Sequence, residues 1–190
     1  KIAEVAEDFG LGQIFDIFLP NQKKGIIPTK QWKKNTLDQS WYGGETLISG
    51  IGQGFVLTNP LQLAVMTSII ASNGKIIKPS IIKTNNVNFK ANNKYTKEIK
   101  IIKNAMFKVV NENKGTAFKS RLESVKFAGK TGTSQVKRIT LSERESDDFR
   151  TKEQEWKNRD HALFVGYIPY DDPKYAVSVT SGSTALHLTI

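Results

Sequence analysis

The tetrad Lys130-Thr131-Gly132-Thr133 brings an ammonium group, two hydroxyls and a glycine together in four consecutive residues. Its threonines favour a strand, on which Lys130 and Gly132 share one face while Thr131 and Thr133 share the other. Gly132 would let a ligand approach the backbone, and a backbone N–H at a developing oxyanion contributes about 3 kcal/mol to transition-state stabilisation. The tetrad therefore suits a substrate with a carboxylate beside a reactive carbonyl. By itself it is weak evidence, because these residue types are also common at the ends of ordinary strands.

Turn residues and β-branched runs predict the strands that must hold this tetrad. The tetrad begins a strand predicted over residues 130–136, and two more strands are expected at 162–168 and 175–179. Pro, Tyr, Asp, Asp and Pro occupy residues 169–173, which is a strong turn signal between these two strands. The three strands together predict an antiparallel meander.

Apolar spacing predicts three helices, over residues 2–9, 60–72 and 104–111. The second has Pro60 at its first position and Thr58 or Asn59 as its cap, and Asn73-Gly74 ends it. The other stretches are interpreted as irregular or extended. Residues 21–46 are predicted to be mostly loop, residues 75–103 short strands or extended segments, and residues 137–160 an exposed charged connection that is partly helical around 153–157.

The composition narrows the possible functions. The 190 residues carry 28 Lys and Arg against 18 Asp and Glu, a formal charge of +10, but the Lys residues are dispersed, as on a solvated surface. Binding of nucleic acid is therefore not expected. Cys is absent, which excludes disulfides and thiolate chemistry. The two histidines, His161 and His187, lack partners for a catalytic triad or a metal site.

Further motifs stand in a fixed order around the tetrad and carry a resemblance to the class B penicillin-binding proteins. Residues 128–135 read A-G-K-T-G-T-S-Q and resemble the family's A-G-K-[ST]-G-T-[AS]-Q, which contains its Lys-Thr-Gly signature. Residues 50–54 and 58–64 resemble its G-I-G-Q-G and T-P-L-Q-[LM]-A segments. Residues 9–12, 19–20, 25–29, 115–117 and 161–169 align in order, and W-K at 32–33 and W-Y-G-G-E-T at 41–46 resemble the penicillin-binding protein 2 branch.

The resemblance implies an α+β fold of the β-lactamase/transpeptidase type, with an antiparallel sheet packed with helices and incomplete at its N-terminal side. Residues 1–179 would be the C-terminal part of the transpeptidase domain, and residues 180–190 a divergent tail. The family consists of serine-type D,D-transpeptidases at the periplasmic face of the bacterial inner membrane, which cross-link peptidoglycan through an acyl-enzyme. The expected partners are the peptidoglycan stem peptide, β-lactams and cell-elongation membrane proteins, with no cofactor and no metal.

The resemblance also implies roles for the tetrad. Lys130 resembles the lysine that orders the active-site hydrogen bonds and draws the substrate carboxylate. Thr131 and Thr133 resemble the family's hydroxyl residues, and the backbone N–H of Thr133 corresponds to half of an oxyanion hole. We therefore expect Lys130, Thr131 and Thr133 to act in catalysis, and the whole tetrad, including Gly132, to bind substrate. The Gly-rich stretch at 50–54 is interpreted as a turn packed near this site.

The nucleophile of the family is missing from its expected place. S-x-x-K strings occur at 72–75, 80–83 and 134–137, but they lie within or beyond the matched segments, and the chain has no S-x-N string. A serine needs its lysine one helical turn away to lose its proton. We therefore expect a fragment that is inactive alone. The alternatives are an inactive truncated gene product, or a β-lactam hydrolase or sensor of the same superfamily.

Overall fold

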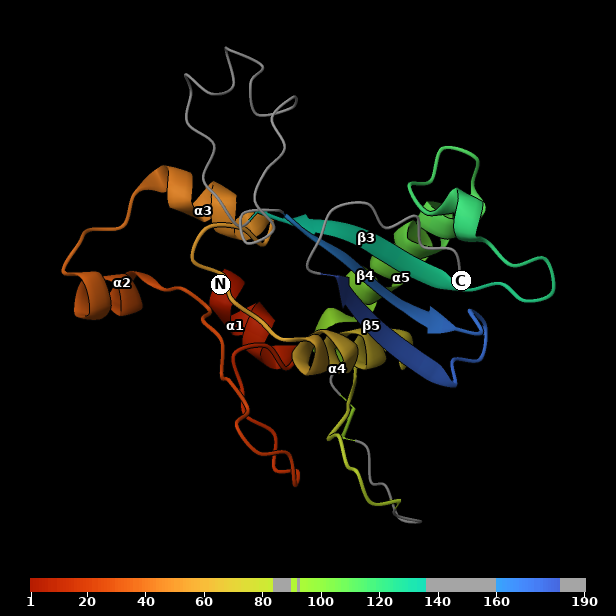
Figure 1. Cartoon of the computed structure of the whole chain (residues 1–190), viewed down its shortest axis with the longest axis horizontal. Coiled ribbons are helices and arrows are strands. Elements are labelled where there is room, and N and C mark those ends of the chain that lie inside the picture. The colour runs from red at the N-terminus through yellow and green to blue at the C-terminus, as the bar shows by residue number, and fades with distance from the viewer. Residues whose placement is uncertain (84–89, 92, 136–159, 182–190) are drawn as a thin grey trace.

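The computed structural model describes residues 1–83, 90–91, 93–135 and 160–181 (Figure 1). The helices are α1 (Ile2–Asp8), α2 (Lys30–Leu37), α3 (Gly43–Gly50), α4 (Pro60–Ala71) and α5 (Thr96–Asn111), with the short 3-10 helices η1 (Asn93–Tyr95) and η2 (Phe118–Ser120). The strands are β1 (Lys75–Ile76), β2 (Lys90–Ala91), β3 (Ala128–Ser134), β4 (His161–Ile168) and β5 (Tyr175–Ser181).

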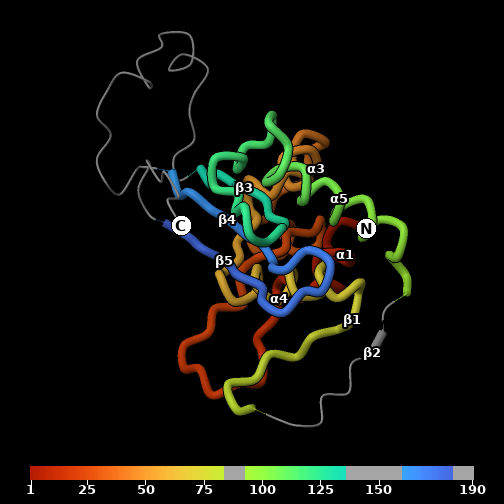
Figure 2. The backbone as a smooth tube through the Cα atoms, turned by 90° about the vertical axis from the view of Figure 1, so that its right-hand side faces the viewer, coloured from red at the N-terminus to blue at the C-terminus, as the bar shows by residue number. Residues whose placement is uncertain are grey.

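The predicted three-stranded meander is present. Strands β3, β4 and β5 pair in sequence order and antiparallel, with Ala128 opposite Tyr167 and Tyr167 opposite Ala176. Helix α5 packs against β3, and α4 packs against β4 and β5. Figure 2 shows the sheet on the left with α1 and α5 to its right. The main core lies between the sheet and the helices α4 and α5. It is formed by buried side chains of all three: Val65, Ile69, Ile99, Met106, Ala128 and Tyr167.

A pair of glycines lets an aromatic ring lie across β3 and β4. Gly129 and Gly166 are opposite each other, and a Cβ added to Gly129 would lie 2.3 Å from the Phe164 ring. A Cβ on Gly166 would lie 2.8 Å from the same ring. Phe164 is 5% exposed and joins a second cluster with Val110, Ala117 and Phe127 on the sheet face away from the main core. The glycines therefore make room for the packing that fixes the start of β3.

Helix α4 is bounded by the residues that the sequence indicated. The Asn59 side chain accepts a hydrogen bond from the N–H of Gln62, and Pro60 is the first residue of the helix. At the other end, Asn73 has φ of +59°, and the N–H of Gly74 donates to the carbonyl of Ile69. This is the Schellman arrangement, which satisfies the last helical carbonyls. Gln62 is fully buried and donates to the carbonyls of Gln13 and Lys24, so α4 also holds the preceding loop.

The prediction that residues 21–46 are mostly loop is wrong in part, because α2 and the start of α3 lie there. A tertiary contact stabilises them. Lys33 of α2 is 1% exposed, and its Nζ donates to Glu45 Oε1 at 2.5 Å and to the Ser40 carbonyl at 2.8 Å. Its ammonium group also lies 4.6 Å from the centre of the Tyr42 ring. The hydrogen bond from Lys33 lowers the pKa of the Glu45 carboxyl, which also accepts from the Tyr42 N–H.

The assignment of extended structure up to residue 103 is also wrong in part. Residues 99–102 read Ile-Lys-Ile-Ile, which resembles a strand, but they lie inside α5. Ile99, Met106 and Val110 are all buried, at a spacing that matches one helical face. Ile101 is 70% exposed, so the β-branched run contributes one core residue rather than a strand. The predicted helix around 153–157, most of the charged connection, His187 and the tail from 182 lie outside the described residues.

The face of β5 away from α4 carries apolar side chains in contact with solvent. Tyr175, Val177 and Val179 are 70%, 43% and 42% exposed, and they alternate along the strand. The meander therefore has an apolar face that the described residues leave uncovered. Within the described part of the chain, no helix has the length and apolar character needed to span a membrane.

The glycine pair yields a prediction about stability. Gly129→Ala forces a methyl group into the Phe164 ring, and we expect it to lower the free energy of unfolding by about 1–3 kcal/mol, as overpacking does. Gly132→Ala is the matched control on the same strand, because its added Cβ would lie 3.4 Å from Leu163, an ordinary contact. Urea unfolding of the protein that contains this chain measures both. Equal stability of the two variants would show that the packing of the Phe164 ring does not require glycine at position 129.

Candidate active site

Strand β3 is the edge of its sheet in the described structure, with β4 on one side only. Two carbonyls of the tetrad bind side chains instead of β4. The Lys130 Nζ donates to the Thr131 carbonyl at 2.5 Å, and the Gln53 Nε2 donates to the Thr133 carbonyl at 2.8 Å. Both carbonyls therefore face away from β4. Because the N–H and C=O of one strand residue point to the same side, the N–H groups of Thr131 and Thr133 face outward too. We call this row of backbone groups the outer edge of β3.

The side chains of the tetrad alternate as the sequence predicted. Lys130 is opposite Val165 and Gly132 opposite Leu163, whereas Thr131 is opposite Phe164 and Thr133 opposite Ala162. Lys130, Gly132 and Thr133 are exposed, and Thr131 is half-buried. Lys130 bends its ammonium group around the outer edge to reach the neighbouring carbonyl. The accessible edge of β3 thus carries a cation on one face, two hydroxyls on the other face, and outward N–H groups between them.

Thr131 is held by the segment that follows α5. The hydroxyls of Thr116 and Thr131 are 2.7 Å apart, within hydrogen-bond distance. Gly115 lets the chain turn tightly against the end of α5, because a Cβ there would lie 2.1 Å from the Val109 carbonyl. The Asn111 side chain donates to the Phe127 carbonyl at 2.8 Å and fastens the end of α5 to the residue before β3. The 115–117 motif noted in the sequence therefore lies beside the tetrad.

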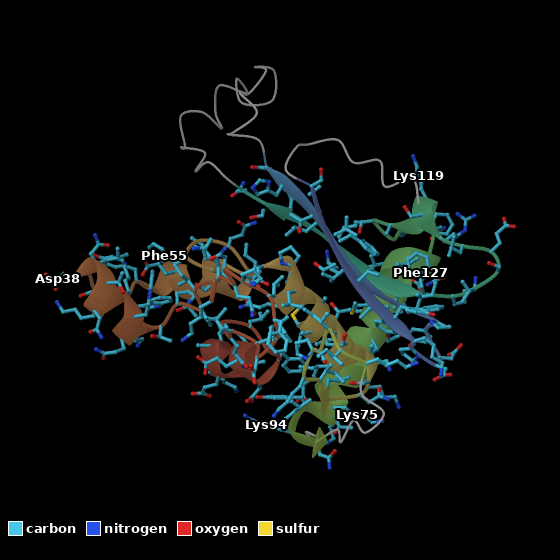
Figure 3. All side chains as sticks on the ribbon, turned by 60° about the horizontal axis from the view of Figure 1, so that its bottom comes forward. Asp38, Phe55, Lys75, Lys94, Lys119 and Phe127 are labelled. Carbon is cyan, nitrogen blue, oxygen red and sulfur yellow. The ribbon has the colours of Figure 1, made fainter. Side chains whose placement is uncertain are left out.

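The approach of Gln53 to Thr133 was only partly foreseen. The sequence placed the Gly-rich stretch at 50–54 near the site as a turn, and the stretch does reach β3. Gly50, however, is the last residue of α3, so the stretch is a helix end followed by a turn. In Figure 1 the arrowhead of β3 points toward α3. In Figure 3 the labelled Phe55 and Asp38 lie at the opposite end of the molecule from Lys119 and Phe127.

The described S-x-x-K strings do not form a nucleophile. Ser72 follows the last residue of α4 and donates to the Ile69 carbonyl at 3.2 Å, while Lys75 begins β1. Ser80 lies outside any helix or strand and donates to the Ile82 carbonyl at 2.7 Å. Neither serine has its lysine one helical turn away. Ser134 lies on β3, and Lys137 is outside the described residues.

Other polar groups lie apart from the tetrad. A cavity of about 480 Å³ between α1, α4 and β1 is lined by both acidic and apolar side chains, and none of its lining residues belongs to β3. Asp8 lines it and accepts from Lys94 and the Tyr95 hydroxyl, which together lower the pKa of its carboxyl. Across residues 1–83, 90–91, 93–135 and 160–181, no group of three or more His, Asp or Glu side chains is arranged to hold a metal ion.

Comparison with known proteins identifies the family. Residues 1–185 match the family described as "Penicillin binding protein transpeptidase domain". The chain is 34% identical over 182 residues to the peptidoglycan D,D-transpeptidase MrdA of Acinetobacter baumannii, covering 90% of this chain and 26% of that protein. It is 31% identical to MrdA of Haemophilus influenzae, covering 94% of this chain and 29% of that protein.

Solved structures agree with this assignment. The penicillin-binding protein PBP2 of Helicobacter pylori, solved in complex with MreC, matches with a TM-score of 0.77 and 32% identity over 95% of this chain and 32% of its own. PBP2 of Pseudomonas aeruginosa, in complex with WCK 5153, matches with a TM-score of 0.75 and 33% identity over 94% of this chain and 38% of its own.

The comparisons confirm both the family and the fold class predicted from the sequence. The chain spans a little over a quarter of the length of the two MrdA relatives. It has helices packed on an antiparallel sheet, as in these neighbours, and represents part of that domain. The predicted boundary at residue 179 stays a prediction. The chain belongs to the penicillin-binding protein transpeptidase family and resembles its PBP2-type members.

Proposed function

We propose that this chain supplies the substrate-binding strand of a serine-type D,D-transpeptidase that cross-links peptidoglycan. The observation that carries the proposal is the outer edge of β3, where the Lys130 ammonium lies at the Thr131 carbonyl, Gln53 holds the Thr133 carbonyl, and the Thr131 hydroxyl is held by Thr116. The names of the MrdA relatives support the reaction class. The nucleophilic serine would come from a segment outside these 190 residues, and this polypeptide alone would be inactive.

In the proposed reaction the serine Oγ attacks the carbonyl between the two D-Ala residues of a stem peptide. The N–H of Thr133 would stabilise the oxyanion that forms on the carbonyl oxygen, because a fixed donor at that position favours the transition state. The serine proton passes to the departing nitrogen as the C–N bond breaks, so the terminal D-Ala leaves as an amine and an ester to serine remains. An amine on a neighbouring peptidoglycan strand attacks that ester and forms the amide cross-link. A proton from this amine restores the serine hydroxyl.

Lys130 and the threonine hydroxyls would bind the carboxylate of the terminal D-Ala. An ammonium group and hydroxyl donors at an exposed strand edge make charge-assisted hydrogen bonds to a carboxylate. The Lys130 Nζ is bound to a backbone carbonyl at this edge, so its charge already lies beside Thr131. Gly132 adds no Cβ between the peptide and the strand. A β-lactam, which also has a carboxylate near its reactive carbonyl, would occupy the same edge.

The setting of the whole protein is part of the proposal. We infer a transpeptidase at the periplasmic face of the inner membrane, with peptidoglycan stem peptides and β-lactams as its ligands. A protein of the cell-elongation machinery is the expected partner, because PBP2 of Helicobacter pylori was solved in complex with MreC. Binding of nucleic acid is not part of this function.

Labelling with a fluorescent penicillin tests where the nucleophile lies. We expect no covalent labelling of the 190-residue polypeptide alone, because its described S-x-x-K strings lack the required geometry. The protein that joins this chain to a segment with S-x-x-K and S-x-N should be labelled at the serine of that segment. Covalent labelling of the isolated 190-residue polypeptide would contradict the proposal.

The role of Lys130 is tested by Lys130→Ala in the protein that carries the serine. Loss of one charge-assisted hydrogen bond should slow acylation by penicillin about 10-fold to 150-fold. Lys126→Ala, at an exposed lysine just before β3, is the matched control and should keep the wild-type rate. A penicillin with an esterified carboxylate should react equally with wild type and Lys130→Ala. If Lys130→Ala slows acylation by that ester as strongly as it slows acylation by the free acid, Lys130 does not bind the carboxylate.

A further inference from the structure

Gln53 connects helix α3 to the site strand across 80 residues of sequence. Its Nε2 donates to the Thr133 carbonyl at 2.8 Å. Thr133 is next to the last residue of β3, where a strand is prone to fray. Its carbonyl faces away from β4, so no ladder bond from β4 holds it. The Gln53 amide is therefore the group that fixes this carbonyl in the described structure.

The end of α3 is built to present Gln53. The N–H of Gly52 donates to the Ser49 carbonyl, and the N–H of Gln53 donates to the Ile48 carbonyl. With Gly52 at φ of +75°, these two bonds form a Schellman motif in which Gln53 is the second residue after the cap. A hydrophobic residue commonly occupies that position and packs back on the helix. Here a glutamine stands there, and its side chain extends to β3 instead.

The other end of α3 is fixed as well. Glu45 accepts from the N–H of Tyr42 at 2.7 Å, which closes a capping box at the first turn. The same carboxyl binds the buried Lys33 of α2. After Gln53, Gly54 has φ of +73°, and a Cβ there would lie 2.9 Å from Ile48. Helix α3 is thus joined to α2 at its start and closed by a defined turn at its end, and this turn directs the Gln53 side chain to β3.

We propose that Gln53 is a positioning residue for acylation: its amide holds the Thr133 carbonyl, and with it the Thr133 N–H, at the outer edge of β3. The inference rests on the proposed function, because it assigns the Thr133 N–H to the oxyanion. Gln53 touches neither the substrate carbonyl nor the serine. Its contribution is to keep the strand end from moving when the charge develops on the oxygen.

The test uses Gln53→Glu in the protein that contains both this chain and the serine. At pH 7.5 the carboxylate repels the Thr133 carbonyl, and we expect penicillin acylation about 3-fold to 10-fold slower than wild type. A protonated carboxyl can donate to that carbonyl, so the deficit should shrink as the pH falls to 5, toward the glutamic acid pKa of about 4.3. Gln13→Glu is the matched control, because the Gln13 side chain donates to a backbone carbonyl of α1, at Glu7. It should keep the wild-type rate at both pH values.

Hydrogen exchange separates this inference from the proposed function. The Ser134 amide, next to the held carbonyl, should exchange about 3-fold to 10-fold faster in Gln53→Glu than in wild type. A wild-type protein that penicillin does not acylate would refute the proposed function. Unchanged Ser134 exchange in Gln53→Glu would overturn the role of Gln53. A slower acylation that does not depend on pH and follows a lower Tm would overturn it too, since that pattern indicates general destabilisation.

Discussion

The central constraint in this structure is that β3 must keep one backbone edge open while the rest of the strand is fixed. An open edge exposes unpaired N–H and C=O groups, which invite another chain to pair with them. In the described structure the outer carbonyls bind Lys130 and Gln53, and the Thr131 hydroxyl binds Thr116. Under the proposed function, the outward N–H groups of Thr131 and Thr133 bind the peptide substrate. The edge is thereby held in shape without being closed by another strand.

The packing beneath β3 serves this constraint. Ala128 is fully buried in the main core, where α5 packs against β3, and Gly129 lies under the Phe164 ring on the other face. The first two residues of β3 are thus packed on both faces of the sheet, and the tetrad follows directly after them. The opposite edge of the sheet differs, since Val177 and Val179 of β5, on the same face as Phe164, contact solvent. The sheet is therefore well packed at the start of β3, next to the proposed site, and exposed to solvent at β5 in the described structure.

Sequence motifs of a few residues predicted the helix ends and turns that depend only on neighbouring residues. Asn59 and Pro60 mark the start of α4, and the turn at 169–173 marks the β4–β5 hairpin. Helices α2 and α3 were missed because a contact between Lys33 and Glu45, 12 residues apart, stabilises them. The start of α5 was missed because isoleucines favour strands locally, while burial of Ile99 and Met106 decides for a helix. At the site, the tetrad and its strand were predictable. The Gln53–Thr133 and Thr116–Thr131 contacts were not, since no periodic pattern links residues on different elements; their motifs were the available hint.

The most direct test of this account is a crystal structure of the acyl adduct that a penicillin forms with the protein containing this chain. The account predicts that the acyl carbonyl oxygen accepts a hydrogen bond from the Thr133 N–H, at about 2.7–3.1 Å. It also predicts the penicillin carboxylate beside Lys130 and the threonine hydroxyls, with the Gln53 amide still on the Thr133 carbonyl. An adduct whose carbonyl and carboxylate lie away from the outer edge of β3 would contradict it.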